Sequence, residues 1–168
     1  MKKDKDMNYH NITKEDMLNG DGIRVVLWVS GCDHHCKNCQ NPITWDKNDG
    51  LLFDEAAETE LFEALDKPFI SGITFSGGDP LMPYNRDEVF RLIKKCCKLY
   101  PDKTIWLYTG YRWEEIQDIK GIELVDVVAE GEFIEELKDN NLHWVGSSNQ
   151  RVINAKETLQ KGEIILHK

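Results

Sequence analysis

Short, almost continuously apolar segments alternate with amphipathic helical patterns along most of the sequence, and this alternation limits the possible folds. The first such segment, residues 23–29, is rich in β-branched side chains and carries a single charge, at Arg24. This pattern is typical of a strand that is buried on both faces, as in a parallel sheet. Further strands are predicted at residues 69–75, 104–108 and 124–129, and helices at residues 54–66, 86–99 and 112–119. Because parallel strands need crossover connections, we expect an α/β fold with helices between the strands.

The length of the chain limits how far such a sheet can close. The 168 residues suit one domain with a sizeable core, whereas a closed eight-stranded barrel needs about 250 residues. We therefore expect residues 1–168 to form one α/β unit, as an open doubly wound sheet or an incomplete (partial) βα barrel with a mostly parallel sheet. The weaker patterns predict a polar tail at residues 1–6, a helical turn at 132–138, short strands at 143–145 and 163–166, and an extra C-terminal segment at 154–168.

The composition excludes several classes of function. Hydrophobic residues make up 40% and charged residues 30% of the chain, as in ordinary globular proteins. The net charge of −9 argues against nucleic acid or an anionic membrane as the main partner. No apolar segment is long enough to span a membrane, and none follows the charged start as in a signal peptide. The expected location is therefore the cytoplasm.

Three of the five cysteines fall within eight residues, in the pattern C-x3-C-x2-C, directly after the predicted strand 23–29. They are Cys32, Cys36 and Cys39. Three thiolates so close together can hold one [4Fe–4S] cluster and leave its fourth iron open for chemistry. Zinc is the alternative, with His34 or His35 as a fourth ligand, but zinc sites commonly use a second cysteine pair that this sequence lacks. The spacing favours the cluster.

The remaining cysteines and histidines have plainer interpretations. Cys96 and Cys97 lie in a predicted amphipathic helix, where a free cysteine packs as a small hydrophobic residue. His34 and His35 are expected to be solvated or hydrogen-bonded rather than metal ligands. Cys36 and Cys39 also have the C-x2-C spacing of a thiol–disulfide switch, which is a further alternative for this loop.

A second distinctive loop, Ser-Gly-Gly-Asp-Pro at residues 76–80, follows the predicted strand 69–75. Gly77 and Gly78 let the backbone approach a ligand closely, and Asp79 offers an acceptor for an ammonium group. By itself the loop is equally well explained as a turn. Both loops follow parallel strands, so we expect them to be neighbours at the C-terminal edge of the sheet, where α/β folds bind ligands.

These two motifs, in this order, resemble the radical S-adenosylmethionine superfamily. Over residues 7–153 the sequence further resembles the anaerobic ribonucleoside-triphosphate reductase activating proteins. The ending Trp-x-Gly-Ser-Ser-Asn-Gln at residues 144–150 is more diagnostic of that family than the cysteines are. Three positions depart from the family's frequent residues, which are proline at Asp21, glycine or an aromatic at Asn38, and tyrosine at Gln40.

The resemblance implies a fold, two cofactors and a set of residues that bind them. The fold is an incomplete barrel of the radical S-adenosylmethionine type. Cys32, Cys36 and Cys39 would hold a [4Fe–4S] cluster, and the amino and carboxylate groups of S-adenosylmethionine would chelate its fourth iron. The remaining S-adenosylmethionine site is assigned to the backbone of Asn38, Cys39 and Gln40 and to Gly77, Gly78 and Asp79, which would meet the methionyl ammonium group.

The resemblance also implies an activity, that of a radical oxidoreductase acting as a glycyl-radical activase. One electron from the reduced cluster cleaves S-adenosylmethionine to methionine and a 5′-deoxyadenosyl radical, which abstracts a hydrogen atom from a glycine of the anaerobic reductase. No catalytic residue beyond the cluster and cofactor is required, and no Ser/His/Asp or paired-carboxylate pattern is evident. The implied partners are the large subunit of that reductase and an electron donor such as flavodoxin. An unclosed barrel would let the partner's glycine loop enter from the side.

Two other functions and several residue roles stay open at this point. The chain could be another small radical enzyme, similar to pyruvate formate-lyase activase or to deazapurine synthase, or a zinc-binding module without catalysis. Asp126 could reach a ligand or cap a turn, and residues 147–150 could touch the partner or a cofactor. The aromatic residues that could line the cavity or fill the core are Trp45, Trp106, Tyr108, Tyr111 and Trp144.

Overall fold

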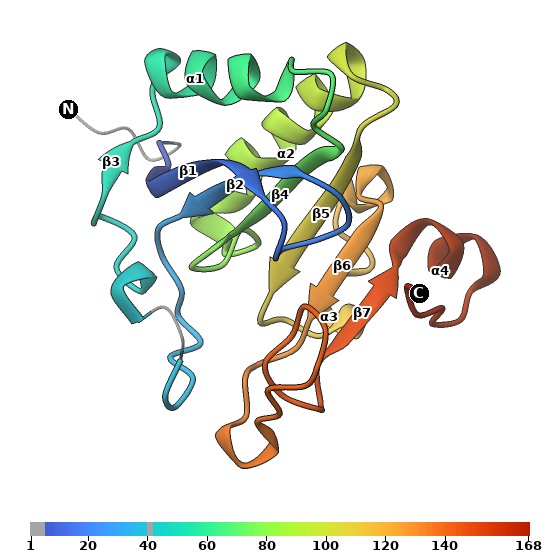
Figure 1. Ribbon diagram of the computed structural model, residues 1–168. Coiled ribbons are helices and arrows are strands. Elements are labelled where there is room, and N and C mark those ends of the chain that lie inside the picture. The colour runs from blue at the N-terminus through green and yellow to red at the C-terminus, as the bar shows by residue number, and fades with distance from the viewer. Residues whose placement is uncertain (1–5, 40–41) are drawn as a thin grey trace.

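The computed structural model describes residues 6–39 and 42–168 and has an α/β architecture (Figure 1). Seven strands form one open, mixed sheet in the order β3–β1–β2–β4–β5–β6–β7. The strands are β1 (Asn8–Asp16), β2 (Arg24–Val29), β3 (Leu51–Leu52), β4 (Gly72–Gly77), β5 (Thr104–Thr109), β6 (Val127–Glu130) and β7 (Arg151–Asn154). The helices are α1 (Glu55–Leu65), α2 (Pro83–Leu99), α3 (Trp113–Ile116) and α4 (Ala155–Lys161).

The centre of the sheet is parallel, as the alternation predicts. β2, β4, β5 and β6 pair in parallel, whereas β1 and β3 add antiparallel strands on one side and β7 on the other. The loop after β2 and the segment after β6 lie together at the lower end of the view in Figure 1, beyond the carboxyl ends of the strands. Within the described part of the chain, no helix is both long and apolar enough to cross a membrane.

The two faces of the central sheet have different environments. On β2, Val25, Leu27 and Val29 join the main hydrophobic core, which also contains Leu61 of α1 and Leu92 of α2. Because side chains alternate along a strand, Arg24, Val26 and Trp28 point to the opposite face, which we call the inner face. The loop between β1 and β2 covers part of it, since the carbonyl oxygen of Asn19 accepts a hydrogen bond from the Thr74 hydroxyl at 2.7 Å.

Arg24, the single charge in the first strand, is completely buried and joins three strands on the inner face. Its Nε donates to the Thr74 hydroxyl at 2.9 Å, and its Nη1 donates to Asp21 O and to the Thr104 hydroxyl. Its Nη2 donates to the carbonyl oxygens of Ile73 and Thr104. All five N–H groups are therefore satisfied by neutral oxygens, and burial lowers the pKa of the guanidinium to about 10.

Several element boundaries differ from the sequence prediction. The predicted strand at residues 69–75 begins only at Gly72, and the predicted strand at 124–129 begins at Val127 because residues 122–124 form a 3₁₀ turn. The predicted helix at 86–99 begins earlier, at Pro83, where proline suits the first turn of a helix. The short strand predicted at residues 143–145 is wrong, because that segment has no regular structure. Of the strand predicted at 163–166, a single bridge between Leu166 and Ile153 is present.

Replacing Arg24 by lysine should destabilise the protein strongly. Lysine has three donors, so at least two of the buried oxygens that now bind the guanidinium would lose their partner. For Arg24→Lys we expect the free energy of unfolding of the cluster-free protein in urea to fall by about 2–4 kcal/mol. Arg91→Lys, on the half-exposed face of α2, is the matched control and should change it by less than about 0.5 kcal/mol. Equal effects would contradict the role given to Arg24.

Candidate functional site

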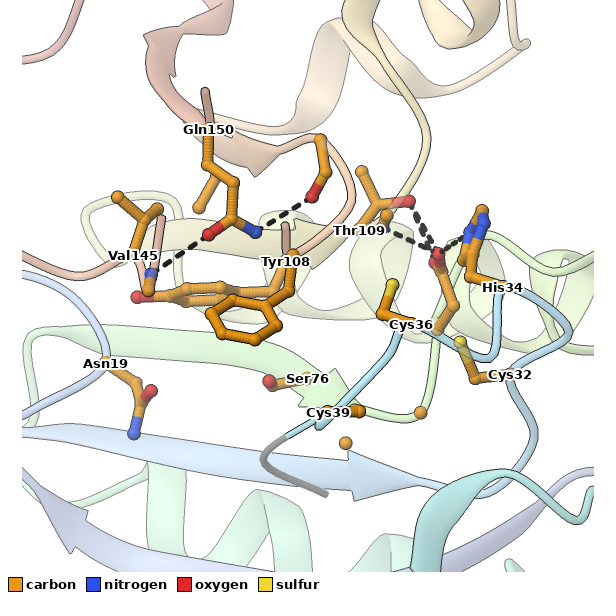
Figure 2. Close-up of a pocket in the computed structure, with 18 of the residues that line it drawn as sticks. Asn19, Cys32, His34, Cys36, Cys39, Ser76, Tyr108, Thr109, Val145 and Gln150 are labelled. Atoms are coloured by element: carbon orange, nitrogen blue, oxygen red, sulfur yellow. Dashed lines mark hydrogen bonds and ion pairs between the residues drawn. The ribbon is translucent and has the colours of Figure 1, made fainter. Parts of the chain in front are cut away.

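A cavity of about 240 Å³ lies at the carboxyl ends of the central strands (Figure 2). The cysteine loop and the Gly-Gly loop both line it, as predicted. Their proximity follows from the parallel pairing of β2 with β4, and two backbone bonds continue that pairing beyond the strands. Gly78 N donates to Val29 O and Asp79 N donates to Gly31 O, each at 2.8 Å.

Cys32, Cys36 and Cys39 line this cavity, and none of the three is in a disulfide bond. Burial raises the pKa of the Cys32 thiol to about 12 and also raises that of Cys36. The loop turns between the cysteines at His35 and Asn38, which have φ angles of 50° and 55°. Asparagine is one of the residues that tolerate this left-handed conformation, which explains why it can stand where the family often has glycine.

Asp79 is buried at the centre of the site, and its carboxylate accepts hydrogen bonds from three parts of the chain. The donors are Leu81 N in its own loop, the Thr109 hydroxyl and Gly110 N at the end of β5, and His34 Nε2 in the cysteine loop, at 2.8–2.9 Å. Both carboxylate oxygens are thus engaged within the protein. The predicted contact of Asp79 with an ammonium group stays a prediction, and what the structure adds is that this carboxylate joins the loops around the cavity.

His34 lies between two carboxylates. Nε2 is 2.8 Å from Asp79 Oδ2 and Nδ1 is 3.0 Å from Glu132 Oε1, and the ring packs edge-on against Tyr111 at 4.7 Å. The hydrogen bond with Asp79, followed by its charge and then Glu132, raises the pKa of the imidazole, and each ring nitrogen has a carboxylate oxygen as its partner. The hydrogen-bonded role expected for His34 is therefore confirmed, and neither nitrogen is left for a metal. His35 instead stacks on Trp45 at 4.5 Å.

The segment after β6 reaches across to the cysteine loop through two acidic residues. Glu132 binds His34, and Glu135 accepts a hydrogen bond from the Asn38 side chain and pairs with Lys37 at 3.5 Å. The side chain of Asn38 is thus used within the protein, and its predicted backbone contact with a cofactor stays a prediction. Gln40, which was assigned to the same site, lies outside the described residues.

The motif at residues 147–150 fastens this segment in place. Gln150 Oε1 accepts from Gly146 N and Ser147 N at 2.9 and 3.0 Å, and Gln150 Nε2 donates to Gly131 O at 2.8 Å (Figure 2). Asn149 Nδ2 donates to Glu132 O at 2.8 Å. The structure therefore gives the motif a local structural role. The sequence had offered two other roles for it, contact with the partner or contact with a cofactor.

Asp126 lies at the opposite end of the sheet from the cavity, so its suggested contact with a ligand there is wrong. It precedes β6, where its carboxylate accepts from Ile105 N at 2.7 Å and pairs with Lys156 at 3.0 Å. The carboxylate thus binds the neighbouring strand β5 and a lysine of α4 rather than capping a turn. The sequence pattern places Asp126 beside a strand but not at a particular end of it. Because the predicted strand at 124–129 begins only at Val127, Asp126 precedes β6 instead of lying at its carboxyl end.

The candidate aromatic residues divide between core and cavity. Tyr108 and Trp144 line the cavity, whereas Trp106 is buried beside Arg24, with the guanidinium 5.6 Å from the ring centroid. Lining residues that the sequence analysis did not single out include Asn19, Trp28, Thr109 and Phe133. The alternation along the strand could have identified Trp28, since it shares the inner face with Arg24.

No three His, Cys, Asp or Glu side chains in residues 6–39 and 42–168 are arranged to hold a single metal ion. In a cubic iron–sulfur cluster, by contrast, the ligands bind different irons and need not converge on one point. Three thiols around one cavity, next to a loop with exposed backbone, define an iron–sulfur type of site.

Comparison with known proteins gives the same class and then a particular family. The family model described as a 4Fe-4S single cluster domain matches residues 18–153. Relatives named anaerobic ribonucleoside-triphosphate reductase-activating protein include that of Enterobacteria phage T4, 43% identical over 87% of this chain and 93% of the relative. Those of Escherichia coli strain K12 and Haemophilus influenzae are 41% and 40% identical, over 87% and 86% of this chain and 97% and 96% of the relative. The chain belongs to this family of activating proteins, as the resemblance predicted.

Replacing Asp79 by asparagine should loosen the site, because one carboxylate oxygen that accepts hydrogen bonds becomes an amide donor. For Asp79→Asn we expect the cluster-free protein to lose about 2–4 kcal/mol of unfolding free energy. The iron retained after anaerobic reconstitution should fall to less than about half, because the cysteine loop loses its anchor through His34. Asp33→Asn, exposed in the same loop, is the control. Identical iron content in both variants would contradict the anchoring role.

Proposed function

We propose that the chain is an activating enzyme that generates the glycyl radical of an anaerobic (class III) ribonucleoside-triphosphate reductase, with a [4Fe–4S] cluster and S-adenosylmethionine as cofactors. One observation carries the proposal: three cysteine side chains in C-x3-C-x2-C spacing share one cavity with the Gly-Gly-Asp loop at the carboxyl ends of parallel strands. The names of the relatives and the matching iron–sulfur family model support it. The whole of residues 1–168 would act as one unit.

The thiols fit the proposed cluster in number, chemistry and position. Cys32, Cys36 and Cys39 would hold it, because thiolate is the usual ligand of iron–sulfur clusters. Cys96 is buried in α2 and Cys97 is half-buried beside it, so the remaining cysteines stand apart from the cavity. Burial holds the Cys32 and Cys36 thiols in the protonated form, so their protons would be released as the cluster binds.

The Gly-Gly loop suits S-adenosylmethionine because its backbone polar groups line the cavity, and not because the glycines leave empty space for the cofactor. A Cβ atom at Gly77 would collide with Val29 O, and one at Gly78 would collide with Gly31 O. The room left by these glycines is therefore taken by the adjacent strand and cysteine loop, which brings backbone polar groups of residues 77–79 to the cavity wall beside the thiols. These groups, with the backbone of Asn38, Cys39 and Gln40, are the proposed contacts of the methionyl part.

The cofactors, when bound, would supply the chemistry: one-electron reductive cleavage of S-adenosylmethionine to methionine and a 5′-deoxyadenosyl radical, which would take a hydrogen atom from the reductase glycine. The chain's own contribution is to hold the cofactors and to exclude water from a reactive site. Phe133 and Trp28 present apolar surface to the cavity for this purpose. The open sheet would be the incomplete barrel of the radical S-adenosylmethionine type, with its unclosed side as the entrance for the glycine, and a flavodoxin-like protein would deliver the electron.

Serine replacements should separate the three cluster ligands from the other cysteines. After anaerobic reconstitution the wild-type protein should hold about four irons and four sulfides per chain, and its reduced EPR signal should change shape on addition of S-adenosylmethionine. Cys32→Ser, Cys36→Ser and Cys39→Ser should each lose this response, while Cys97→Ser should keep it. Bound zinc, or a cluster that ignores S-adenosylmethionine, would contradict the proposal. A thiol–disulfide switch would instead survive Cys32→Ser.

The choice of target can be tested with purified partners. The reduced holo-protein, S-adenosylmethionine and the anaerobic reductase subunit should together give a carbon-centred radical on the reductase, detected by EPR, with one 5′-deoxyadenosine for each radical formed. Replacing the target glycine of the reductase by alanine should abolish the signal. A radical on pyruvate formate-lyase but none on the reductase would favour the rival activase instead.

A further inference from the structure

Two buried hydrogen-bond donors of the cavity have no partner within the described part of the chain. They are the hydroxyl of Tyr108 and the indole N–H of Trp144, and both residues line the cavity. Buried polar groups in native proteins are almost always hydrogen-bonded, so a pair of unsatisfied donors at one cavity calls for an external acceptor. The Trp144 indole can only donate, and burial raises the pKa of the Tyr108 phenol, so both groups keep their protons.

The Tyr108 hydroxyl points to the end of the cavity that is opposite the cysteines. The strand register puts Trp28 beside Ser76 and Tyr108 beside Ala129, so these four side chains form one row across the inner face. Figure 2 shows the Tyr108 ring extending from this row toward Asn19 and Val145, away from the thiols. We call this part of the cavity, lined by Asn19, Trp28, Tyr108, Trp144 and Val145, the tyrosine end.

The tyrosine end is uncharged. Apart from the Tyr108 phenol, the titratable side chains that line the cavity are Cys32, Cys36, Cys39, His34 and Asp79, all at the opposite end. Behind this wall lie Arg24, whose five N–H groups are already bonded, and Asp16, which accepts a hydrogen bond from the Asn19 side chain and whose negative charge acts on Tyr108. A phosphate or carboxylate would therefore find no counter-ion here, and a neutral group with hydrogen-bond acceptors is the matching occupant.

The Trp144 indole is held in place by its surroundings. It stacks on His143 at 3.5 Å and packs edge-on against Trp106 at 5.0 Å between ring centroids. Its φ of 71° is unusual for a bulky residue, and backbone strain of this kind concentrates at ligand-binding positions. A donor fixed in this way binds an acceptor with little loss of side-chain freedom.

We propose that the Tyr108 hydroxyl and the Trp144 indole N–H bind backbone carbonyl oxygens of the reductase segment that carries the target glycine. The inference rests on the proposed function and makes Tyr108 and Trp144 positioning residues for the partner. An extended peptide presents carbonyl acceptors at regular intervals and carries no charge of its own. The adenine of S-adenosylmethionine is the rival occupant. Two of its edges place the amino donor beside a ring acceptor, and its N3 edge offers a single acceptor, so adenine suits a pair of donors less well.

Removing one hydroxyl tests the proposal on the reconstituted holo-protein. Tyr108→Phe should keep the iron and sulfide content and bind S-adenosylmethionine within about twofold of wild type, measured by titration of the reduced EPR signal. Its dissociation constant for the reductase subunit, measured by anaerobic calorimetry with S-adenosylmethionine present, should rise about fivefold to tenfold, as for one lost neutral hydrogen bond. Trp144→Phe should act in the same direction. The control is Tyr100→Phe, which should change neither constant. The hydroxyl that it removes donates to Asp66 and to the carbonyl oxygen of Phe62.

Each other result has a definite meaning. A weaker affinity for S-adenosylmethionine with unchanged affinity for the reductase would overturn the proposal in favour of adenine. Unchanged affinity for both would also overturn it, since the donors would then bind only water. Either result leaves the proposed function intact, because that function is tested on the wild-type protein. It would be refuted if the wild-type protein gave no EPR response to S-adenosylmethionine or no radical on the reductase.

Discussion

The buried carboxylate of Asp79 is the interaction on which the geometry of the site depends. It binds its own loop, the end of β5 and, through His34, the cysteine loop. His34 extends the connection to Glu132 after β6, so one chain of charged hydrogen bonds joins loops from four adjacent strands. A buried carboxylate is costly unless it is paired and fully hydrogen-bonded, and here the His34 ring and the neutral donors bind both of its oxygens. The protein's own hydrogen bonds thereby hold in place the loops that carry the cavity-lining side chains.

The inner face of the sheet has charged groups at its two ends and a neutral region between them. Arg24 closes the amino-terminal end, with neutral oxygens around its guanidinium, and the Asp79–His34 pair closes the carboxyl-terminal end. The row that contains Ser76 and Tyr108 lies between them. Such a separation suits the proposed function and the proposed peptide contact, in which one end of the cavity would hold charged or metal-bound groups and the other would accept a neutral chain.

The sequence predicted those parts of the fold and site that depend on local periodicity and spacing. The buried central strands, the order of the two loops and their proximity follow from patterns that only a parallel sheet satisfies. β1 was missed because it is antiparallel and mostly polar. Its only buried apolar residues are Tyr9 and Ile12, and the polar Asn8 and Asp16 are buried as well, so its pattern resembles a loop. The role of His34 depends on Asp79 and Glu132, which are 45 and 98 residues away in the chain, and no spacing rule contains such partners. That the Tyr108 hydroxyl lacks a partner is likewise visible only in the folded structure.

The glycines of the second loop illustrate how packing and function depend on each other. Gly77 has a φ of 107°, and neither it nor Gly78 has room for a Cβ atom beside the backbone of residues 29–31. Their first effect is to let β4 and its loop approach β2 and the cysteine loop closely, where Gly78 N and Asp79 N make their backbone bonds. Because that approach also sets Asp79 within reach of His34, a side chain at either glycine would move the thiols away from the loop proposed to face them. The ligand-binding role proposed for the motif would thus be a consequence of a steric requirement within the protein.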